Sequence, residues 1–115
     1  MKFKVAVGTE DGLNLDVHFG KCTRFKVFAV DTDISEYSEE AVRTVDNVCK
    51  QCGHSDHDFG ALADALADCK VILINRVGYP ARAFMESRGF AVLPDDGGID
   101  DAVKRLIGRM RDKNN

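Results

Sequence analysis

The sequence predicts a three-layer α/β domain with a mixed five-stranded sheet, in the chain order βββαβαβα. Two patterns and the composition support this prediction. Residues 1–45 contain three segments with strand patterns joined by short connections, and residues 58–111 alternate helix patterns with short apolar runs. The chain has 115 residues, of which 44% are hydrophobic and 30% are charged. That size and balance suit a single domain over residues 1–111, with room for one core and one site.

The first three segments are expected to form an antiparallel meander. Residues 2–7 alternate their side chains with a period of two, which predicts a strand with one face on the core, and Gly8 ends it. A second strand is expected over residues 23–31 and a weaker third strand over residues 34–45. Because the connections are too short for a parallel crossover, neighbouring strands should run in opposite directions.

Helix and strand patterns alternate in the second half of the chain. The expected elements are a helix over residues 58–68, a strand over 71–74, a helix that begins near 80, a strand over 90–93 and a helix that begins at 99. Pro80 suits the first turn of a helix, and Gly89 suits the position after its last turn. Strands that alternate with helices run parallel, so helices should cover both faces of the sheet. Residues 112–115 are expected to form a frayed tail.

Charge and hydropathy argue against several classes of protein. The formal net charge is −3, from 16 basic and 19 acidic residues, and the sequence has no basic stripe of the kind that binds nucleic acid. No apolar run reaches the length of about 18 residues that suggests a membrane-spanning helix. Because the first residues lack the apolar segment of a signal peptide, we expect a cytoplasmic protein. Four cysteines in such a protein are more typical of free thiols or metal ligands than of disulfides.

The densest chemical signal lies between Cys49 and His57. This stretch contains the thiols of Cys49 and Cys52 and the imidazoles of His54 and His57. A Cys-x-x-Cys turn can direct both sulfurs at one soft metal, and imidazole suits zinc, iron or copper. Structural zinc sites usually join two separate ligand pairs, however, whereas this cluster is one continuous stretch. The alternative interpretation is a solvated loop whose thiols do nothing until they are oxidised.

A second candidate is His18, which lies between Val17 and Phe19 in a glycine-containing loop. On the residues alone it is either a packing residue or a ligand, and both interpretations stay open. If this loop and the loop of residues 46–57 converge at one end of the sheet, His18 becomes a ligand or a lid for the same site. Cys22, at the start of the second strand, has the character of a small buried side chain.

The turn at Gly78 is a third candidate, because it follows a buried strand and begins a helix. Such a turn presents backbone N–H groups and a helix dipole that favour an anion, although a plain turn between strand and helix has the same pattern. Arg76 and Arg82 flank the turn and either pair with a negative ligand or stay solvated. Cys69 continues the apolar stripe of the preceding helix, so we assign it to the core.

Segments spread over nearly the whole chain carry a resemblance to a known family. They are residues 1–8, His18-Phe19-Gly20, and residues 25–31, 66–71, 77–78, 88–90 and 98–102. In their order and spacing they resemble the nitrogenase iron–molybdenum cofactor-binding family, of the NifX-like and NifB C-terminal-domain type. The resemblance implies a ribonuclease H-like three-layer fold without nuclease activity. It also implies binding of an iron–sulfur–molybdenum cofactor or its precursor, for storage, delivery or insertion.

The resemblance also bears on single residues. The histidine of the His-Phe-Gly segment is implicated in cofactor binding in some members of that family, so the resemblance assigns this role to His18. Many members are shorter where this chain carries the stretch from Cys49 to His57, so the cysteine and histidine cluster is not inherited from the general family pattern.

Our main hypothesis is a non-catalytic protein that binds or carries an iron–sulfur–molybdenum cluster or its precursor. Thiolate or imidazole completes an open metal position on such a cluster, while backbone N–H groups and arginine stabilise its negative charge. The expected partners are the cluster and a cofactor-assembly or acceptor protein. The expected cofactor-binding residues are His18, Phe19, Gly20, Arg76 and Gly78. The expected metal ligands are His18, Cys49, Cys52, His54 and His57.

Two alternatives belong to other classes. The first is a zinc-stabilised protein-interaction module that uses Cys49, Cys52, His54 and His57. The second is a divalent-metal nuclease, because the element order resembles ribonuclease H-like folds, which cut with metal-bound carboxylates. The predicted first strand carries Lys2 and Lys4 and no acid, which argues against a nuclease. The sequence also has no nucleophile elbow, phosphate loop or His-Glu-x-x-His motif, so we do not expect an enzyme.

Overall fold

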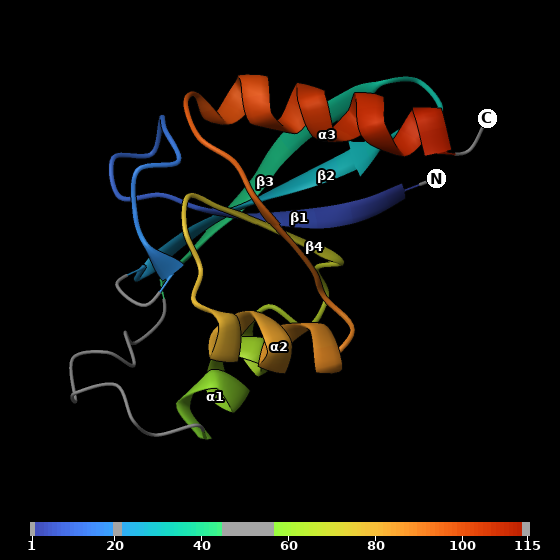
Figure 1. Ribbon diagram of the computed structural model, residues 1–115. Coiled ribbons are helices and arrows are strands. Elements are labelled where there is room, and N and C mark those ends of the chain that lie inside the picture. The colour runs from blue at the N-terminus through green and yellow to red at the C-terminus, as the bar shows by residue number, and fades with distance from the viewer. Residues whose placement is uncertain (1, 20–21, 45–56, 114–115) are drawn as a thin grey trace.

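The structure is a computed structural model, and it describes residues 2–19, 22–44 and 57–113 (Figure 1). Within these residues the chain forms one five-stranded sheet in the order β3-β2-β1-β4-β5. The elements along the chain are β1 (Lys2–Gly8), β2 (Arg24–Asp31), β3 (Glu36–Thr44), α1 (His57–Ala65), β4 (Val71–Ile74), α2 (Tyr79–Ser87), β5 (Ala91–Pro94) and α3 (Ile99–Lys113).

The sheet is mixed, as the sequence predicts. β1 pairs antiparallel with β2, and β2 pairs antiparallel with β3. β1 pairs parallel with β4, and β4 pairs parallel with β5. Both the antiparallel meander and the parallel second half are therefore confirmed. β1 lies between the two halves, so its hydrogen bonds join the meander to the parallel part of the sheet.

Helices cover both faces of the sheet, which is also confirmed (Figure 1). α3 packs on one face, where Val5, Val7 and Leu73 from the sheet meet apolar residues of the helix. α1 and α2 pack on the other face, against Ala6 and Ile72. The expectation that β1 buries only one face is wrong. Val5, Ala6 and Val7 are all buried, because helices shield both sides of this central strand.

The ends of several elements differ from the predicted ones by a few residues. α1 ends at Ala65, three residues early, and β3 begins at Glu36, two residues late. α3 continues to Lys113, beyond the expected start of the tail, while residues 114–115 lie outside the described part. The two predicted helix signals are confirmed, since Pro80 lies in the first turn of α2 and Gly89 adopts a positive φ of 97° just after it.

β3 is an edge strand, and most of its side chains are exposed. This exposure explains why its pattern in the sequence is weak. The register between β2 and β3 shifts by one residue, so that Phe28 faces Glu39 and Val27 faces Ala41. The extra residue is Glu40, which makes this point a β-bulge.

Among the described helices, none combines the length and the apolar character needed to cross a membrane.

Candidate functional site

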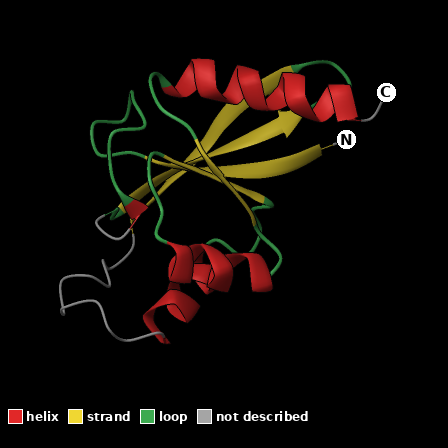
Figure 2. Cartoon of the chain, viewed as in Figure 1, coloured by secondary structure: helices red, strands yellow, loops and turns green. Residues whose placement is uncertain are grey.

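The candidate site lies at the edge where the parallel strands end. Because β1, β4 and β5 run in the same direction, their carboxyl ends meet at one edge of the sheet. The segments that follow them are residues 9–19, 75–78 and 95–98, and Figure 2 shows these loops gathered at that edge. Open α/β sheets bind their ligands at this edge, so these loops are the candidate site.

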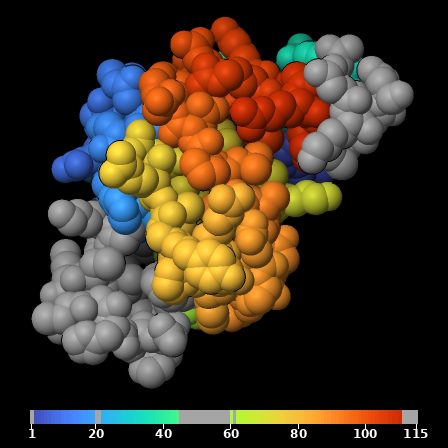
Figure 3. Space-filling view, in the orientation of Figure 1, coloured from blue at the N-terminus to red at the C-terminus, as the bar shows by residue number. Residues whose placement is uncertain are grey.

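The loop of residues 9–19 lies across the ends of β4 and β5. The backbone amide of Leu15 donates to the carbonyl oxygen of Gly97 at 2.8 Å, and Ile99 donates to Leu13 at 2.9 Å. Further along, the amide of Phe19 donates to the carbonyl oxygen of Arg76 at 2.8 Å. In the space-filling view the blue residues of this loop lie directly beside the yellow residues after β4 (Figure 3).

His18 lies on the surface of this loop beside Arg76. Leu15, Val17 and Phe19 are buried, whereas Asp16 and His18 are exposed, so the segment alternates like a strand. The backbones of His18 and Arg76 form an isolated parallel bridge. Phe19 packs edge-to-face against Phe25, with 6.4 Å between the ring centroids. His18 is therefore not a core packing residue, and its neighbours Val17 and Phe19 pack in the core instead.

The turn after β4 brings Gly78 into the same region. Gly78 is the N-cap of α2, with an extended backbone (φ −73°, ψ 156°) and no side-chain hydrogen bond to the helix start. The first turn of α2 contains Pro80 and no acidic residue. The partial positive charge of the helix dipole at this N-terminus is therefore not neutralised by a carboxylate in the first turn. Arg76 is exposed two residues earlier, so the two features together favour an anion.

A compact set of hydrogen bonds shapes the first part of the loop. The buried hydroxyl of Thr9 donates to the carbonyl oxygen of Asn14 at 2.7 Å and accepts from the amide of Gly12 at 2.9 Å. The carboxylate of Asp11 accepts from the amides of Leu13 and Asn14, both at 2.8 Å. The side chain and amide of Asn14 and the amide of Leu13 lower the pKa of Asp11 to about 2.

Sequence reasoning did not identify these loop residues. The available signal was the spacing of Thr9, Asp11 and Asn14, because short polar side chains at such intervals commonly hydrogen-bond to nearby backbone groups in turns.

A polar depression of about 400 Å³ lies beside Arg76. Its lining residues are Asn75, Arg76, Pro94, Asp95 and Asp96. Asp95 is engaged by Arg105 of α3, with 2.9 Å between Nη2 and Oδ1. Burial raises the pKa of Asp95, but its bonds with Arg105 and with the amide of Asp96 outweigh this effect and hold the pKa below its ordinary value. The negative charge of Asp95 is thus largely balanced within the fold.

The side chains at this edge differ from those of a typical bare metal-ion site. Among the residues that the structure describes, no group of three or more histidine, cysteine, aspartate or glutamate side chains could hold a metal ion. The imidazole of His18 is a side chain that could bind a metal, and the guanidinium of Arg76 and the amides at the start of α2 are groups that could donate to negative charge.

Several predicted site residues lie outside the described residues. They are Gly20, Cys49, Cys52 and His54. His57 is the first residue of α1, and its side chain is likewise outside the described part. The idea that the thiols share a pocket with His18, and the zinc module built on the same residues, therefore stay predictions.

The two other cysteines are structural. Cys22 and Cys69 are free thiols with exposed fractions of 2% and 6%, so the assignment of Cys69 to the core is confirmed. The thiol of Cys22 donates to the carbonyl oxygen of Arg24 at 3.1 Å. Burial raises the pKa of both thiols to about 11, which makes them poor ligands and poor nucleophiles near neutral pH.

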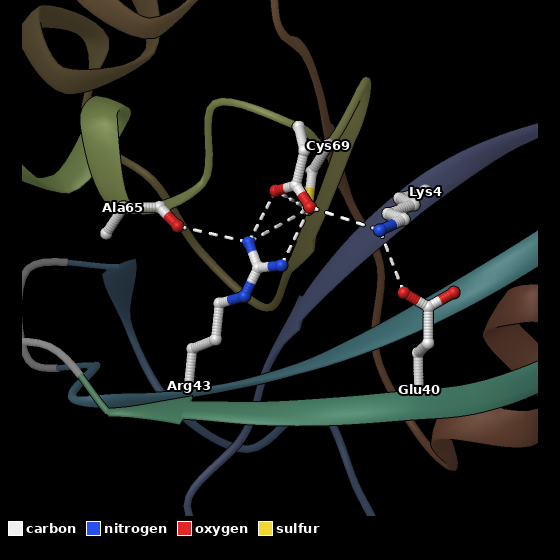
Figure 4. A network of polar contacts seen from close by, with 6 residues as sticks. Lys4, Glu40, Arg43, Ala65 and Cys69 are labelled. Atoms are coloured by element: carbon white, nitrogen blue, oxygen red, sulfur yellow. Dashed lines mark hydrogen bonds and ion pairs between the residues drawn. The ribbon is translucent and has the colours of Figure 1, made fainter.

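An ion-pair network lies near Cys69 (Figure 4). Cys69 precedes β4, whereas the candidate site lies at the other end of this strand. Arg43 of β3 contacts the carboxylate of Asp68 and donates to the carbonyl oxygen of Ala65 at 3.1 Å. Lys4 of β1 bridges Asp68 and Glu40, at 3.2 and 2.8 Å. The hydrogen bond with Arg43 holds the pKa of Asp68 far below its usual range. We interpret this network as a structural tie between β1, the edge strand β3 and the end of α1.

Comparison with known proteins places this arrangement in a family. The chain is similar to the FeMo cofactor biosynthesis protein NifB of Chlorobaculum tepidum, with 28% identity over 100 residues, and to that of Rhodobacter capsulatus, with 31% identity over 88 residues. These matches cover 86% and 76% of this chain. The chain spans only about a fifth of the length of these curated relatives, 22% and 19%.

Solved structures and a family model complete the comparison. The crystal structure of PH0822 has a TM-score of 0.70 and 26% identity, and the match covers 92% of this chain and 89% of that one. A crystal structure from Methanocaldococcus jannaschii has a TM-score of 0.63 at 12% identity, over 94% of this chain and 90% of that one, and so shows the same fold. The model of the family described as dinitrogenase iron-molybdenum cofactor matches residues 1–109. This protein therefore belongs to the dinitrogenase iron–molybdenum cofactor family.

Proposed function

We propose that this protein is a non-catalytic carrier for an iron–sulfur–molybdenum cluster or its precursor, and that it acts in storage, delivery or insertion of that cluster. The observation that supports the proposal is the proximity of His18 and Arg76 at the edge of the sheet where the parallel strands end. There the loop of residues 9–19 is bonded to the turn after β4, so that exposed His18 lies beside Arg76. Family membership supports a role in cofactor biosynthesis.

Each group has a distinct task in this proposal. The cluster brings open metal positions and negative charge, and an imidazole can complete one metal position. We assign that ligand role to His18 and the charge-balancing role to Arg76. The start of α2, which Gly78 caps without a side-chain bond, adds N–H donors to the negative surface of the cargo. Phe19 is buried, so its task is to anchor the segment rather than to touch the cluster.

A carrier role fits the modest number of ligands. Tight enclosure by many side chains would hinder transfer to an acceptor, whereas an exposed edge leaves the cluster accessible to a second protein. We therefore propose a cofactor-assembly or acceptor protein as the partner. The similar NifB proteins are much longer than this chain, so their whole activity does not transfer to it.

For the fold, we infer a ribonuclease H-like arrangement. The sheet order β3-β2-β1-β4-β5, with an antiparallel first half and a parallel second half, supports this inference. The nuclease alternative has little support, because β1 carries two lysines and no carboxylate.

Anaerobic binding of isolated iron–molybdenum cofactor tests the proposed function. We expect the wild-type chain to acquire a visible absorption band and to retain molybdenum and iron through gel filtration. His18→Ala should reduce both signals, whereas Leu13→Ala, which alters an exposed side chain of the same loop, should leave them unchanged.

Two results would contradict this proposal. If the wild type retains no cofactor, the carrier role is wrong. If metal analysis of the purified protein instead finds one zinc per chain, unaffected by His18→Ala, the zinc-stabilised module is the better interpretation.

A further inference from the structure

The segment that carries His18 is held at both ends by consecutive residues of the turn after β4. At one end the side-chain amide of Asn75 donates to the carbonyl oxygen of Leu15 at 3.0 Å. At the other end the carbonyl oxygen of Arg76 accepts from the amide of Phe19 at 2.8 Å. The second bond uses only backbone atoms and forms whatever side chain occupies position 76. The first bond depends on the identity of residue 75.

Asn75 is well placed to fix the loop. It directly follows β4, whose four residues are all buried between the two helical layers. The carbonyl oxygen of the preceding Ile74 accepts from the amide of Asp95 at 2.9 Å, so the backbone beside Asn75 is itself anchored to the end of β5. Asn75 is half-buried, which shields its bond to Leu15 from competing water. The side-chain amide of Asn75 is therefore held in place by the backbone at the ends of β4 and β5.

The register of this segment decides where His18 points. Leu15, Val17 and Phe19 are buried, and His18 lies between the last two on the exposed side. In an extended segment neighbouring side chains lie on opposite sides, so even a small slide or twist redirects the imidazole. The hydrogen bond from Asn75 to the carbonyl oxygen of Leu15 limits that movement, and it does not require Asn75 to contact the cargo.

We propose that Asn75 is a positioning residue for His18, and this inference rests on the proposed function. Asn75 holds the carbonyl group of Leu15, and thereby keeps the imidazole of His18 at the place where the cluster arrives. Sequence reasoning did not identify Asn75. Its position directly after a buried parallel strand is the signal that could have indicated it, because such positions face the binding edge of the sheet.

A double-mutant cycle tests whether Asn75 acts through His18. Affinity for isolated iron–molybdenum cofactor is measured for the wild type, N75A, H18A and the double variant. We expect N75A to weaken binding by about fivefold, the effect of one hydrogen bond. In the H18A background the same change should have no further effect. Equal weakening in both backgrounds, or no weakening in the wild type, would overturn the proposal.

Two further variants separate positioning from general stability. Asn75→Asp has the same shape but at neutral pH offers no donor to Leu15, so it should weaken cofactor binding at least as much as N75A. Ser87→Ala removes another side-chain hydrogen bond to a backbone carbonyl, at Phe84 in α2, and should not alter binding. Urea unfolding of all variants shows whether each one folds, and affinities are compared only among folded proteins.

A cofactor-free measurement decides the positioning role even if the proposed function fails. In the protein without cofactor, N75A or N75D should shift the amide resonances of His18 and Phe19 and speed the hydrogen exchange of the Phe19 amide by about fivefold. Unchanged resonances and exchange would overturn the role of Asn75. If the wild type binds no cofactor but these amides respond, the carrier proposal fails and the structural tie stands.

Discussion

Phe19 and Arg76 are joined by a backbone hydrogen bond of 2.8 Å, from the amide of Phe19 to the carbonyl oxygen of Arg76. This bond ties a loop near the N-terminus to the turn after β4. Since it does not involve the guanidinium group, the side chain of Arg76 can be changed without removing the tie. The link between the two segments therefore depends on backbone atoms alone, whereas the proposed interaction with negative charge depends on the side chain of Arg76.

Replacing Arg76 tests the charge-balancing role directly. We expect Arg76→Ala to leave the free energy of unfolding nearly unchanged and to weaken cofactor binding by about two- to fivefold, because an exposed charge interaction contributes about 1 kcal/mol or less. Arg82→Ala is the matched control, since Arg82 lies nearby in α2 and its guanidinium group pairs with the carboxylate of Glu86 at 3.3 Å. Equal loss of affinity in both variants would indicate a general charge effect rather than a site at Arg76.

Gly8 is expected to tolerate no side chain. A Cβ atom at this position would overlap Cδ1 of Ile74 and would lie 3.1 Å from the sulfur of Cys22. We expect Gly8→Ala to lower the free energy of unfolding by about 1–3 kcal/mol, the usual cost of overpacking a core. Gly108→Ala in α3 is the control, because nothing lies within 4 Å of its Cβ position, and it should raise stability by about 1 kcal/mol. Urea unfolding measures both, and a neutral Gly8→Ala would contradict the packing described here.

Acid should weaken the fold in part through Asp11. The pKa of Asp11 is lowered to about 2 in the folded chain, so its ionised form stabilises the fold at a pH above the ordinary value of about 4. This contribution is lost as the pH falls from about 4 towards 2. We expect Asp11→Asn to flatten the dependence of unfolding free energy on pH in that range, as measured by urea titration at stepped pH values.

A comparison with the wild type decides this prediction. Asp68 also has a strongly lowered pKa, through Arg43, and should give part of the same dependence. The Asp11→Asn curve should therefore retain some slope. A curve parallel to that of the wild type would show that Asp11 does not contribute.

The buried thiols should react slowly in the folded protein. In a Cys49→Ser, Cys52→Ser double variant only Cys22 and Cys69 remain, and both have a pKa raised to about 11 by burial. We expect little alkylation by iodoacetamide at neutral pH in buffer and complete alkylation in denaturing urea, as measured by mass spectrometry. Rapid alkylation in buffer would mean that one of the two thiols is accessible in the native state.

Much of the fold was predictable because local patterns and short connections determine it. The alternation in residues 2–7 and the apolar run at 71–74 identify strands. The short turn at residues 32–35 forces β2 and β3 into an antiparallel pair, whereas the longer connection of residues 9–23 does not by itself determine how β1 pairs with β2. The burial of both faces of β1 was not predictable from alternation alone. Lys2 and Lys4 mark its exposed end, but only the packing of helices from the second half shows that Ala6 is as buried as Val5.

The residues of the candidate site could be selected from the sequence, but their proximity could not be predicted from it. His18, Arg76 and Gly78 stand out by residue type or by position in a turn. Their proximity depends on backbone bonds such as that between Phe19 and Arg76, which any amino acid can form and which leave no mark in the sequence. Asn75 was missed because a single asparagine after a strand is also a common turn residue.

The bulge at Glu40 has a consequence for how copies of this protein meet. An outer strand with open N–H and C=O groups is a template onto which another molecule can add its own strand, the first step of aggregation. The extra residue in β3 breaks the regular spacing of that template, and glutamates at positions 36, 39 and 40 place charged side chains along this edge, a feature that disfavours pairing with another strand. We therefore expect the bulge at Glu40, whose carboxylate also pairs with Lys4, to disfavour the addition of a strand from a second copy.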